Sequence, residues 1–253
     1  MATTKKPAAP KTTAVAVKKE SNVVAITNRL KAQVADLSTR VAPAGGDSIR
    51  VTQDKKFQLP NGTKSEGPLD VVIVDFITVH NYYEGAYDKD NIVPPNCFAI
   101  GRIPLQMIPS ANAPDKQADN CQTCPMNQWG SSGKGKACKN GRLLAVLPPD
   151  ATEDDPLMVI SVSPTAVKAF DAYVAAVALK FGMSPAGVIT EVSFDPSVDY
   201  GSLRFGNPRM NENLDNTASD ARLDAAEARL KQEPDVSSFE AAPPKKVAAA
   251  RRK

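Results

Sequence analysis

Apolar residues recur with two different periods along the chain, and the change falls near residue 48. Before it, the apolar positions are spaced by three and four residues, which predicts a short amphipathic helix that ends near Arg40. These positions are Val23, Ile26, Leu30, Val34 and Leu37. After residue 48 the apolar residues form short runs rich in Val, Ile and Phe, and Pro, Gly and Asn separate them. Such runs are typical of β-strands.

The longest of these runs covers residues 69–80 and predicts a central, bent strand. Shorter strands are expected at 49–59, 97–101, 142–147, 157–162, 188–194 and 202–205. One helix interrupts them, because Pro164 suits a first helical turn and Gly182 suits the position after a last one. Many short strands with one helix predict a mainly β (α+β) fold: an OB-like β-barrel with one packed helix.

Composition divides the chain into three parts. Residues 1–47 form a basic, flexible arm that includes the predicted short helix, and residues 48–207 form the core domain. Residues 208–253 have low complexity, acidic over 210–240 and basic at the end, and Leu214, Leu223, Ala226 and Leu230 indicate a frail acidic helix within them. Both tails are expected to be disordered. No apolar run approaches the roughly 18 residues of a transmembrane helix, so we expect no membrane association.

Three of the four cysteines and the only tryptophan lie within residues 121–142. With Cys97 upstream, the cysteine spacing is C-x23-C-x2-C-x13-C. The basic N-terminus has no apolar segment of a secretory signal, which indicates a reducing, cytoplasmic location. There, such a set favours a metal over disulfides. We expect Cys97, Cys121, Cys124 and Cys138 to hold one structural Zn²⁺ in a zinc knuckle.

Three alternatives to this zinc site stay open: four free buried cysteines, an iron–sulfur cluster, and His80 as a ligand in place of Cys97. A catalytic zinc is not expected, because His80 is the only histidine and Pro125 follows the C-x2-C pair, whereas in a deaminase it precedes the pair. The Gly130–Lys136 segment resembles a P-loop in part, but Ala137 stands where a Ser or Thr must bind Mg²⁺. Nucleotide hydrolysis is therefore not expected.

Basic and aromatic residues around the cysteines predict a surface for single-stranded nucleic acid. No Asp or Glu occurs between Asn120 and Leu147. Binders of single strands combine a basic groove with aromatic faces on which bases stack. The candidate cations are Lys55, Lys56, Arg102, Lys134, Lys136, Lys139 and Arg142, and the candidate stacking residues are Tyr82, Tyr83, Tyr87 and Trp129.

The region from Cys121-x2-Cys124-Pro125 through Gly133-Lys134-Gly135-Lys136-Ala137-Cys138 resembles that of phage-type zinc-containing single-stranded DNA-binding proteins. The resemblance covers residues 49–206 and concerns architecture more than aligned sequence. It implies coating of single strands in DNA replication, recombination and repair, with replication proteins as partners of the C-terminal tail, in the host cytoplasm if a phage encodes the chain. Two features depart from that family: Cys97 stands where a histidine is expected, and the chain ends on Arg251-Arg252-Lys253 where that family ends on an acidic tip.

The sequence thus favours a non-enzymatic single-stranded DNA-binding protein. A second hypothesis is a zinc-stabilised interaction or structural protein that binds other proteins, such as a polymerase regulator or a virion component. A third is a nuclease in which Asp70, Asp75, Asp88 and Asp90 bind Mg²⁺.

Overall fold

The computed structural model describes residues 23–27, 29–30, 33, 47–85 and 93–240 of the chain. The chain divides into two compact units, residues 1–46 and 47–253. In the first unit every described residue is helical, and Val23, Val24, Ile26 and Leu30 are exposed. The predicted helix is confirmed over these residues, and its continuation toward Arg40 lies outside the described part of the chain.

The second unit contains one sheet with the strand order β3-β2-β1-β7-β6-β4-β8-β9, and β5 pairs with β4 beside it. Neighbours are antiparallel except β1 and β7, which are parallel. The bounds are β1 Ser48–Val51, β2 Phe57–Gln58, β3 Lys64–Ser65, β4 Leu69–Tyr82, β5 Cys97–Gly101, β6 Lys139–Leu147, β7 Met158–Val162, β8 Val188–Phe194 and β9 Leu203–Met210. The predicted predominance of strands is confirmed.

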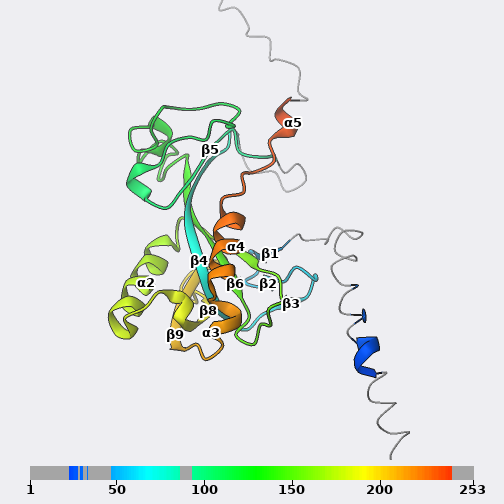
Figure 1. Cartoon of the computed structure of the whole chain (residues 1–253). Helices are drawn as coiled ribbons and strands as arrows, with labels where there is room; N and C mark the ends of the chain where they lie inside the picture. The colour runs from blue at the N-terminus through cyan, green and yellow to red at the C-terminus, as the bar shows by residue number, and fades with distance from the viewer. Residues whose placement is uncertain (1–22, 28, 31–32, 34–46, 86–92, 241–253) are drawn as a thin grey trace, which may run out of the picture. The chain divides into compact units, whose positions relative to one another are not determined.

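Strand β4 is the centre of this sheet (Figure 1). It is 14 residues long, and along one edge its residues from Val72 to Asn81 pair with β6. Along the other edge its first residues pair with β8 and its last with β5. Because it is covered on both faces, it reads as a nearly continuous run of Val and Ile, whereas a half-exposed strand would alternate. The sequence prediction of a long central strand is confirmed.

Two helices cover opposite faces of the sheet. Helix α2 (Val167–Phe181) buries Phe170, Tyr173 and Val177 in the larger core, and it ends at Gly182, whose φ of 67° suits a left-handed cap. Helix α4 (Asp220–Leu230) buries Ala226 and Leu230 against β4 and β6 on the other face. The sequence predicts one packed helix and a frail acidic one, and the structure shows that the second, α4, packs on the sheet as well.

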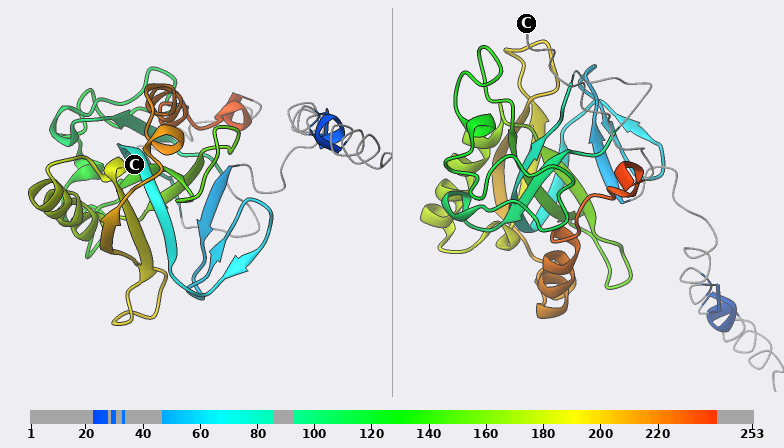
Figure 2. Two further views of the ribbon diagram at one scale, coloured as in Figure 1. Left: turned by 60° about the horizontal axis from the view of Figure 1, so that its bottom comes forward. Right: turned by 90° about the horizontal axis from the view of Figure 1, so that it is seen from above.

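The sheet curls but stays open, as a half-barrel (Figure 2). The curl brings Phe57 of β2 and Phe194 of β8 together, although these strands lie toward opposite ends of the strand order. Their rings stack with centroids 4.4 Å apart. A barrel-like α+β fold is therefore confirmed at this coarse level, while its assignment to the OB class stays a prediction.

The ordered unit extends beyond residue 207, where the sequence predicts a low-complexity tail. Strand β9 continues to Met210 through Pro208, which an edge strand tolerates because one side of it donates no ladder hydrogen bonds. It is followed by α3 (Leu214–Thr217), α4 and α5 (Ser237–Glu240). The core domain was predicted to end at residue 207, before α4, because the few buried apolar residues of α4 lie among many polar surface residues in the sequence. Residues 241–253 lie outside the described part.

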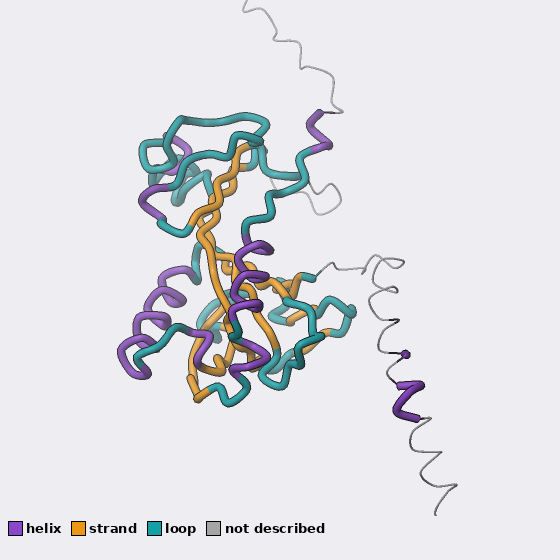
Figure 3. Tube along the Cα trace, viewed as in Figure 1, coloured by secondary structure: helices purple, strands orange, loops and turns teal. Residues whose placement is uncertain are grey.

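The connection between β5 and β6 contains almost no regular structure (Figure 3). Only two short 3-10 turns occur in it, η1 (Pro104–Gln106) and η2 (Pro125–Asn127). We refer to residues 102–138 as the cysteine loop, since it holds Cys121, Cys124 and Cys138. Both of its ends are fixed at the same end of β4, because β5 and β6 pair there.

Candidate functional site

The strand pairing brings the cysteines of distant sequence positions together. Cys97 begins β5 opposite Tyr82, and Cys138 directly precedes β6, where Lys139 pairs with Asn81. All four cysteines are buried, with 6 to 8% of each exposed. None of them forms a disulfide.

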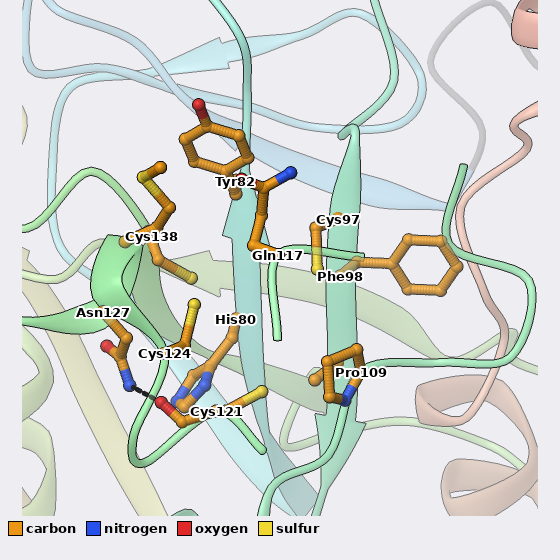
Figure 4. Close-up of a pocket in the computed structure, with 12 residues that line it drawn as sticks. His80, Tyr82, Cys97, Phe98, Pro109, Gln117, Cys121, Cys124, Asn127 and Cys138 are labelled. Atoms are coloured by element: carbon orange, nitrogen blue, oxygen red, sulfur yellow. Dashed lines mark hydrogen bonds between the residues drawn. The ribbon is translucent and has the colours of Figure 1, made fainter. Parts of the chain in front are cut away.

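All four cysteines line one cavity of about 10 Å³, together with His80, Tyr82 and Asn127 (Figure 4). Space of this size holds about one water molecule. The zinc and iron–sulfur alternatives both stay predictions for this cavity.

Backbone hydrogen bonds hold the cysteine loop around this cavity. Cys121 N–H donates to the Met107 carbonyl at 3.1 Å, and Cys138 N–H donates to the Met126 carbonyl at 2.8 Å. The Asn127 side-chain amide donates to the Cys121 carbonyl at 2.6 Å. Asn127 was not among the residues singled out from the sequence, since a lone Asn beside a turn gives no specific signal. Its buried amide links η2 to the first cysteine of the pair.

Burial keeps the thiols of Cys97, Cys121 and Cys138 protonated. It is the main cause that raises the pKa of Cys121 to about 11 and that of Cys138 to about 12, and the neighbouring cysteines raise both further. The pKa of Cys97 is raised for the same main reason. Since a metal binds the thiolate, metal binding here must release protons.

The donor set matches zinc in kind and number, because four cysteines form one of its common closed sites. Within the described residues, however, no three His, Cys, Asp or Glu side chains are arranged closely enough to hold a metal ion. The zinc assignment to Cys97, Cys121, Cys124 and Cys138 stays a prediction.

His80 lies in the wall of the same cavity and is 4% exposed. Its Nδ1 atom is buried without a hydrogen-bond partner among the described residues, and so is Oδ1 of Asn140, the residue opposite it on β6. Burial, followed by the nearby charges of Lys136 and Arg142, lowers the pKa of His80 to about 4. The imidazole is therefore neutral at pH 7. Both Cys97 and His80 line the cavity, so position alone does not choose between them.

The outer part of the cysteine loop presents Trp129, which is 78% exposed. Gly130 N–H donates to the Gly135 carbonyl at 3.0 Å, and the Ser131 hydroxyl donates to the Met126 carbonyl at 2.9 Å, so the turn that carries Trp129 is internally tied. Lys134 is exposed on this turn, and no described residue forms an ion pair with it. We call Trp129, Lys134, Lys136 and Lys139 the loop rim.

The two remaining cations of the rim are partly held by the loop itself. Lys136 Nζ donates to Asn127 Oδ1 at 3.2 Å, and Lys139 Nζ donates to the Lys136 carbonyl at 3.1 Å. Neither bond neutralises the ammonium charge, because both acceptors are uncharged. The rim therefore keeps three positive charges beside one exposed aromatic ring.

The other predicted cations are already engaged. Arg142 is buried and paired with Asp171 of α2 at 2.8 Å, Arg102 is paired with Asp75 at 2.8 Å, and Lys56 with Glu66 at 2.7 Å. Lys55 Nζ donates to the Asp195 carbonyl at 3.3 Å, away from the rim. These positions give no support to their predicted contact with phosphate, and for Arg142 burial argues against it.

The predicted stacking tyrosines that the structure describes are less exposed than Trp129. Tyr82 is partly buried in the wall of the cysteine cavity, where it contacts the cluster of Cys97 and Phe98. Tyr83 is 41% exposed, and partial burial raises its pKa. Tyr87 lies outside the described residues.

Two carboxylates of the nuclease hypothesis lie in the described part of the chain, and both form ion pairs. Asp70 is paired with Arg209 at 2.6 Å, and Asp75 is paired with Arg102. Asp88 and Asp90 lie outside the described part of the chain. The nuclease hypothesis stays a prediction.

Comparison with models of protein families, with curated proteins and with solved structures gave no match in any of the three. In the described part of the chain, no helix is long and apolar enough to cross a membrane.

Proposed function

We propose that this chain is a non-enzymatic single-stranded DNA-binding protein that contacts DNA through the loop rim. The observation that carries the proposal is Trp129, whose ring is 78% exposed on a tied turn among three lysines and no acid. A large aromatic side chain gains by leaving water, so such exposure on a rigid turn favours a partner that stacks on it. The lysines beside it supply charge for the phosphates.

In this proposal a Zn²⁺ held by the cysteine cavity stiffens the loop that carries the rim. Its donors would be Cys121, Cys124 and Cys138 with Cys97, and the ion would supply structure and not chemistry. The proposed biological setting, DNA replication, recombination and repair, rests on the resemblance to zinc-containing phage binders. The same resemblance proposes replication proteins as partners, in the cytoplasm of a host cell.

The test is a titration with oligo-dT, followed in two ways. Trp129 is the only tryptophan, so quenching of protein fluorescence reports on the rim alone. Anisotropy of a labelled oligonucleotide reports binding independently of Trp129. We expect quenching and binding at low salt, with affinity falling steeply as salt rises. If the anisotropy stays flat at low salt, the proposal is wrong.

The variant Trp129→Leu isolates the stacking contribution. One stacked base contributes roughly 1–3 kcal/mol, so the affinity measured by anisotropy is expected to fall about fivefold or more. Leu179→Ala is the matched control, because Leu179 is 89% exposed on α2 and its removal changes no rim residue. An equal loss in both variants would contradict a stacking role.

A protein partner is the second candidate function, and one observation favours it. Ile103, Leu105 and Ile108 are 51, 70 and 64% exposed at the start of the cysteine loop, which places three aliphatic side chains in water within six residues. Leu105→Ser is expected to leave oligo-dT binding unchanged. Loss of binding to a protein partner in this variant, with no response of Trp129 to DNA, would support the second function over the first.

A further inference from the structure

A cavity of about 290 Å³ lies on the face of the sheet opposite the cysteine cavity. Its floor is formed by Val79 of β4, Ile100 of β5 and Leu143 of β6, and Val79 pairs directly with Ile100. Successive side chains of a strand point to opposite faces, so His80 and its partner Ala99, which line the cysteine cavity, point the other way. The two cavities therefore use opposite faces of the same strands.

The chain after α4 passes over this floor, and we call residues 231–236 the strap. At one end of the strap, Leu230 packs with the apolar residues of β4 and β6. At the other end, Val236 packs against the cluster of Cys97 and Phe98. Figure 1 shows the strap running from α4 toward α5. Residues of the strap between these two anchors form the wall of the cavity that faces the floor.

The charged groups of this wall are already engaged. Arg229 donates to the Asp47 carboxylate, with 2.6 Å from Nη2 to Oδ1. Glu233 accepts from the Ser110 hydroxyl with one carboxylate oxygen and from Asn112 Nδ2 with the other, the latter at 2.6 Å. Neither group offers a free counter-charge, so the cavity suits a neutral ligand better than a charged one.

Two side-chain amides complete the lining, from Asn81 of β4 and Gln232 of the strap. Asn81 follows Val79 by two residues and therefore points to the same face. No residue in the described part of the chain hydrogen-bonds to either amide. An amide presents a donor and an acceptor side by side, the pattern with which Asn and Gln bind the edge of adenine. Apolar floor and amide edge together fit a flat ring with apolar faces and a polar rim.

We infer that the cavity under the strap binds a single nucleobase, with one face on Val79, Ile100 and Leu143 and the edge on Asn81 and Gln232. The base belongs either to a free nucleoside or to an unpaired nucleotide of a DNA strand, since both present the same ring. The volume lies just below the roughly 300–1,000 Å³ of typical ligand sites, which suits one base. The inference goes beyond the proposed function and does not depend on it, because it uses no residue of the loop rim.

The test uses the full chain and adenosine, followed by the methyl NMR shifts of Val79, Ile100 and Leu143. We expect saturable upfield shifts, because the ring current of a stacked base shields protons that lie over its face. Asn81→Leu keeps the size of the side chain and removes the amide, so it is expected to weaken adenosine binding about fivefold or more. Gln232→Ala changes an exposed position of the strap and is expected to weaken binding several-fold.

Gln53→Ala is the matched control for Gln232→Ala, since Gln53 is exposed in the turn after β1 and does not line the cavity. It is expected to bind adenosine as the unaltered chain does. The inference is overturned if neither adenosine nor oligo-dA shifts the three methyl groups saturably. It is also overturned if Asn81→Leu and Gln232→Ala bind as tightly as Gln53→Ala.

A titration with oligo-dA distinguishes the source of the base. Upfield methyl shifts with adenosine and none with oligo-dA assign the cavity to a free nucleoside. Shifts with oligo-dA that Asn81→Leu weakens and Trp129→Leu keeps assign it to a base of a DNA strand. A Trp129 response to oligo-dT without any methyl shift would contradict this inference alone. Methyl shifts with adenosine, without any binding of oligo-dT, would contradict the DNA-binding proposal alone.

Discussion

At the scale of single residues, ion pairs tie the ends of the second unit together. Asp47, directly before β1, accepts two hydrogen bonds from Arg229 of α4, one of them 2.6 Å long from Nη2 to Oδ1. The hydrogen bond from Arg229, followed by the charge of that guanidinium, lowers the pKa of the Asp47 carboxyl, although partial burial opposes the shift. The contact thus holds the start of the sheet to the helix that covers it.

We therefore expect Asp47→Asn to lower the free energy of unfolding by about 1 kcal/mol at pH 7. Because the folded pKa lies below the usual 3.8, the contribution is present above that value and disappears as pH falls through the folded pKa. Urea unfolding at pH 7 and at pH 2 measures both effects. Lys231→Gln, which removes an exposed i,i+4 pair with Glu227, is the control and is expected to cost about half as much or less. A deficit of Asp47→Asn that persists unchanged at pH 2 would contradict this account.

The cysteines allow a prediction of metal content at the same scale. If zinc is bound, Cys138→Ser is expected to lose stoichiometric zinc and to lower thermal stability, because the remaining thiols cannot close the site. Elemental analysis and thermal unfolding with and without chelator measure this. Lys139→Gln, one residue further along and exposed, is expected to keep the metal. A purified, reduced chain that is free of metal and indifferent to chelator would contradict the zinc prediction.

At the scale of elements, α2 is the anchor of the larger core. Phe170 is fully buried, and its ring meets those of Phe76 and Phe205 at centroid distances of 5.1 and 5.0 Å. It therefore joins β4 and β9 through one side chain. We expect Phe170→Ala to lower the free energy of unfolding by about 3–5 kcal/mol in urea titration.

Phe181 near the end of the same helix is only partly buried and provides the comparison. Phe181→Ala is expected to cost clearly less than Phe170→Ala. If both variants lowered the free energy of unfolding equally, the buried face of α2 would not be what anchors the helix.

At the scale of the whole molecule, α4 belongs to the folded unit although its sequence is acidic and of low complexity. Leu230 is 1% exposed against β4 and β6, whereas Leu223 on the same helix is 38% exposed. We expect Leu230→Ala to lower the free energy of unfolding by about 2–4 kcal/mol and Leu223→Ala by less than about 1 kcal/mol. If both substitutions lowered the free energy of unfolding by the same small amount, α4 would not be part of the folded unit.

The sequence predicted those elements whose apolar period is unbroken, namely β4, β7, β8 and α2. It indicated a frail acidic helix there but assigned it to the tail, because a helix that contributes only Ala226 and Leu230 to the core has too few apolar positions to show that it packs. It placed the four cysteines correctly in one neighbourhood, since β5 and β6 both pair with the end of β4. The pairing of Arg142 with Asp171 was not foreseeable, because charge in a sequence does not reveal a partner 29 residues away.

The position of β4 between early and late parts of the chain has a consequence for the order of folding. Its partners β5 and β6 lie within residues 69–147, whereas β8 begins only at Val188. Contacts between near neighbours in sequence close smaller loops and form sooner. The contacts of the cysteine loop and its strands can therefore form before those of the larger core. Pulse-labelled amide exchange during refolding is expected to protect Val79 and Leu143 before Val192.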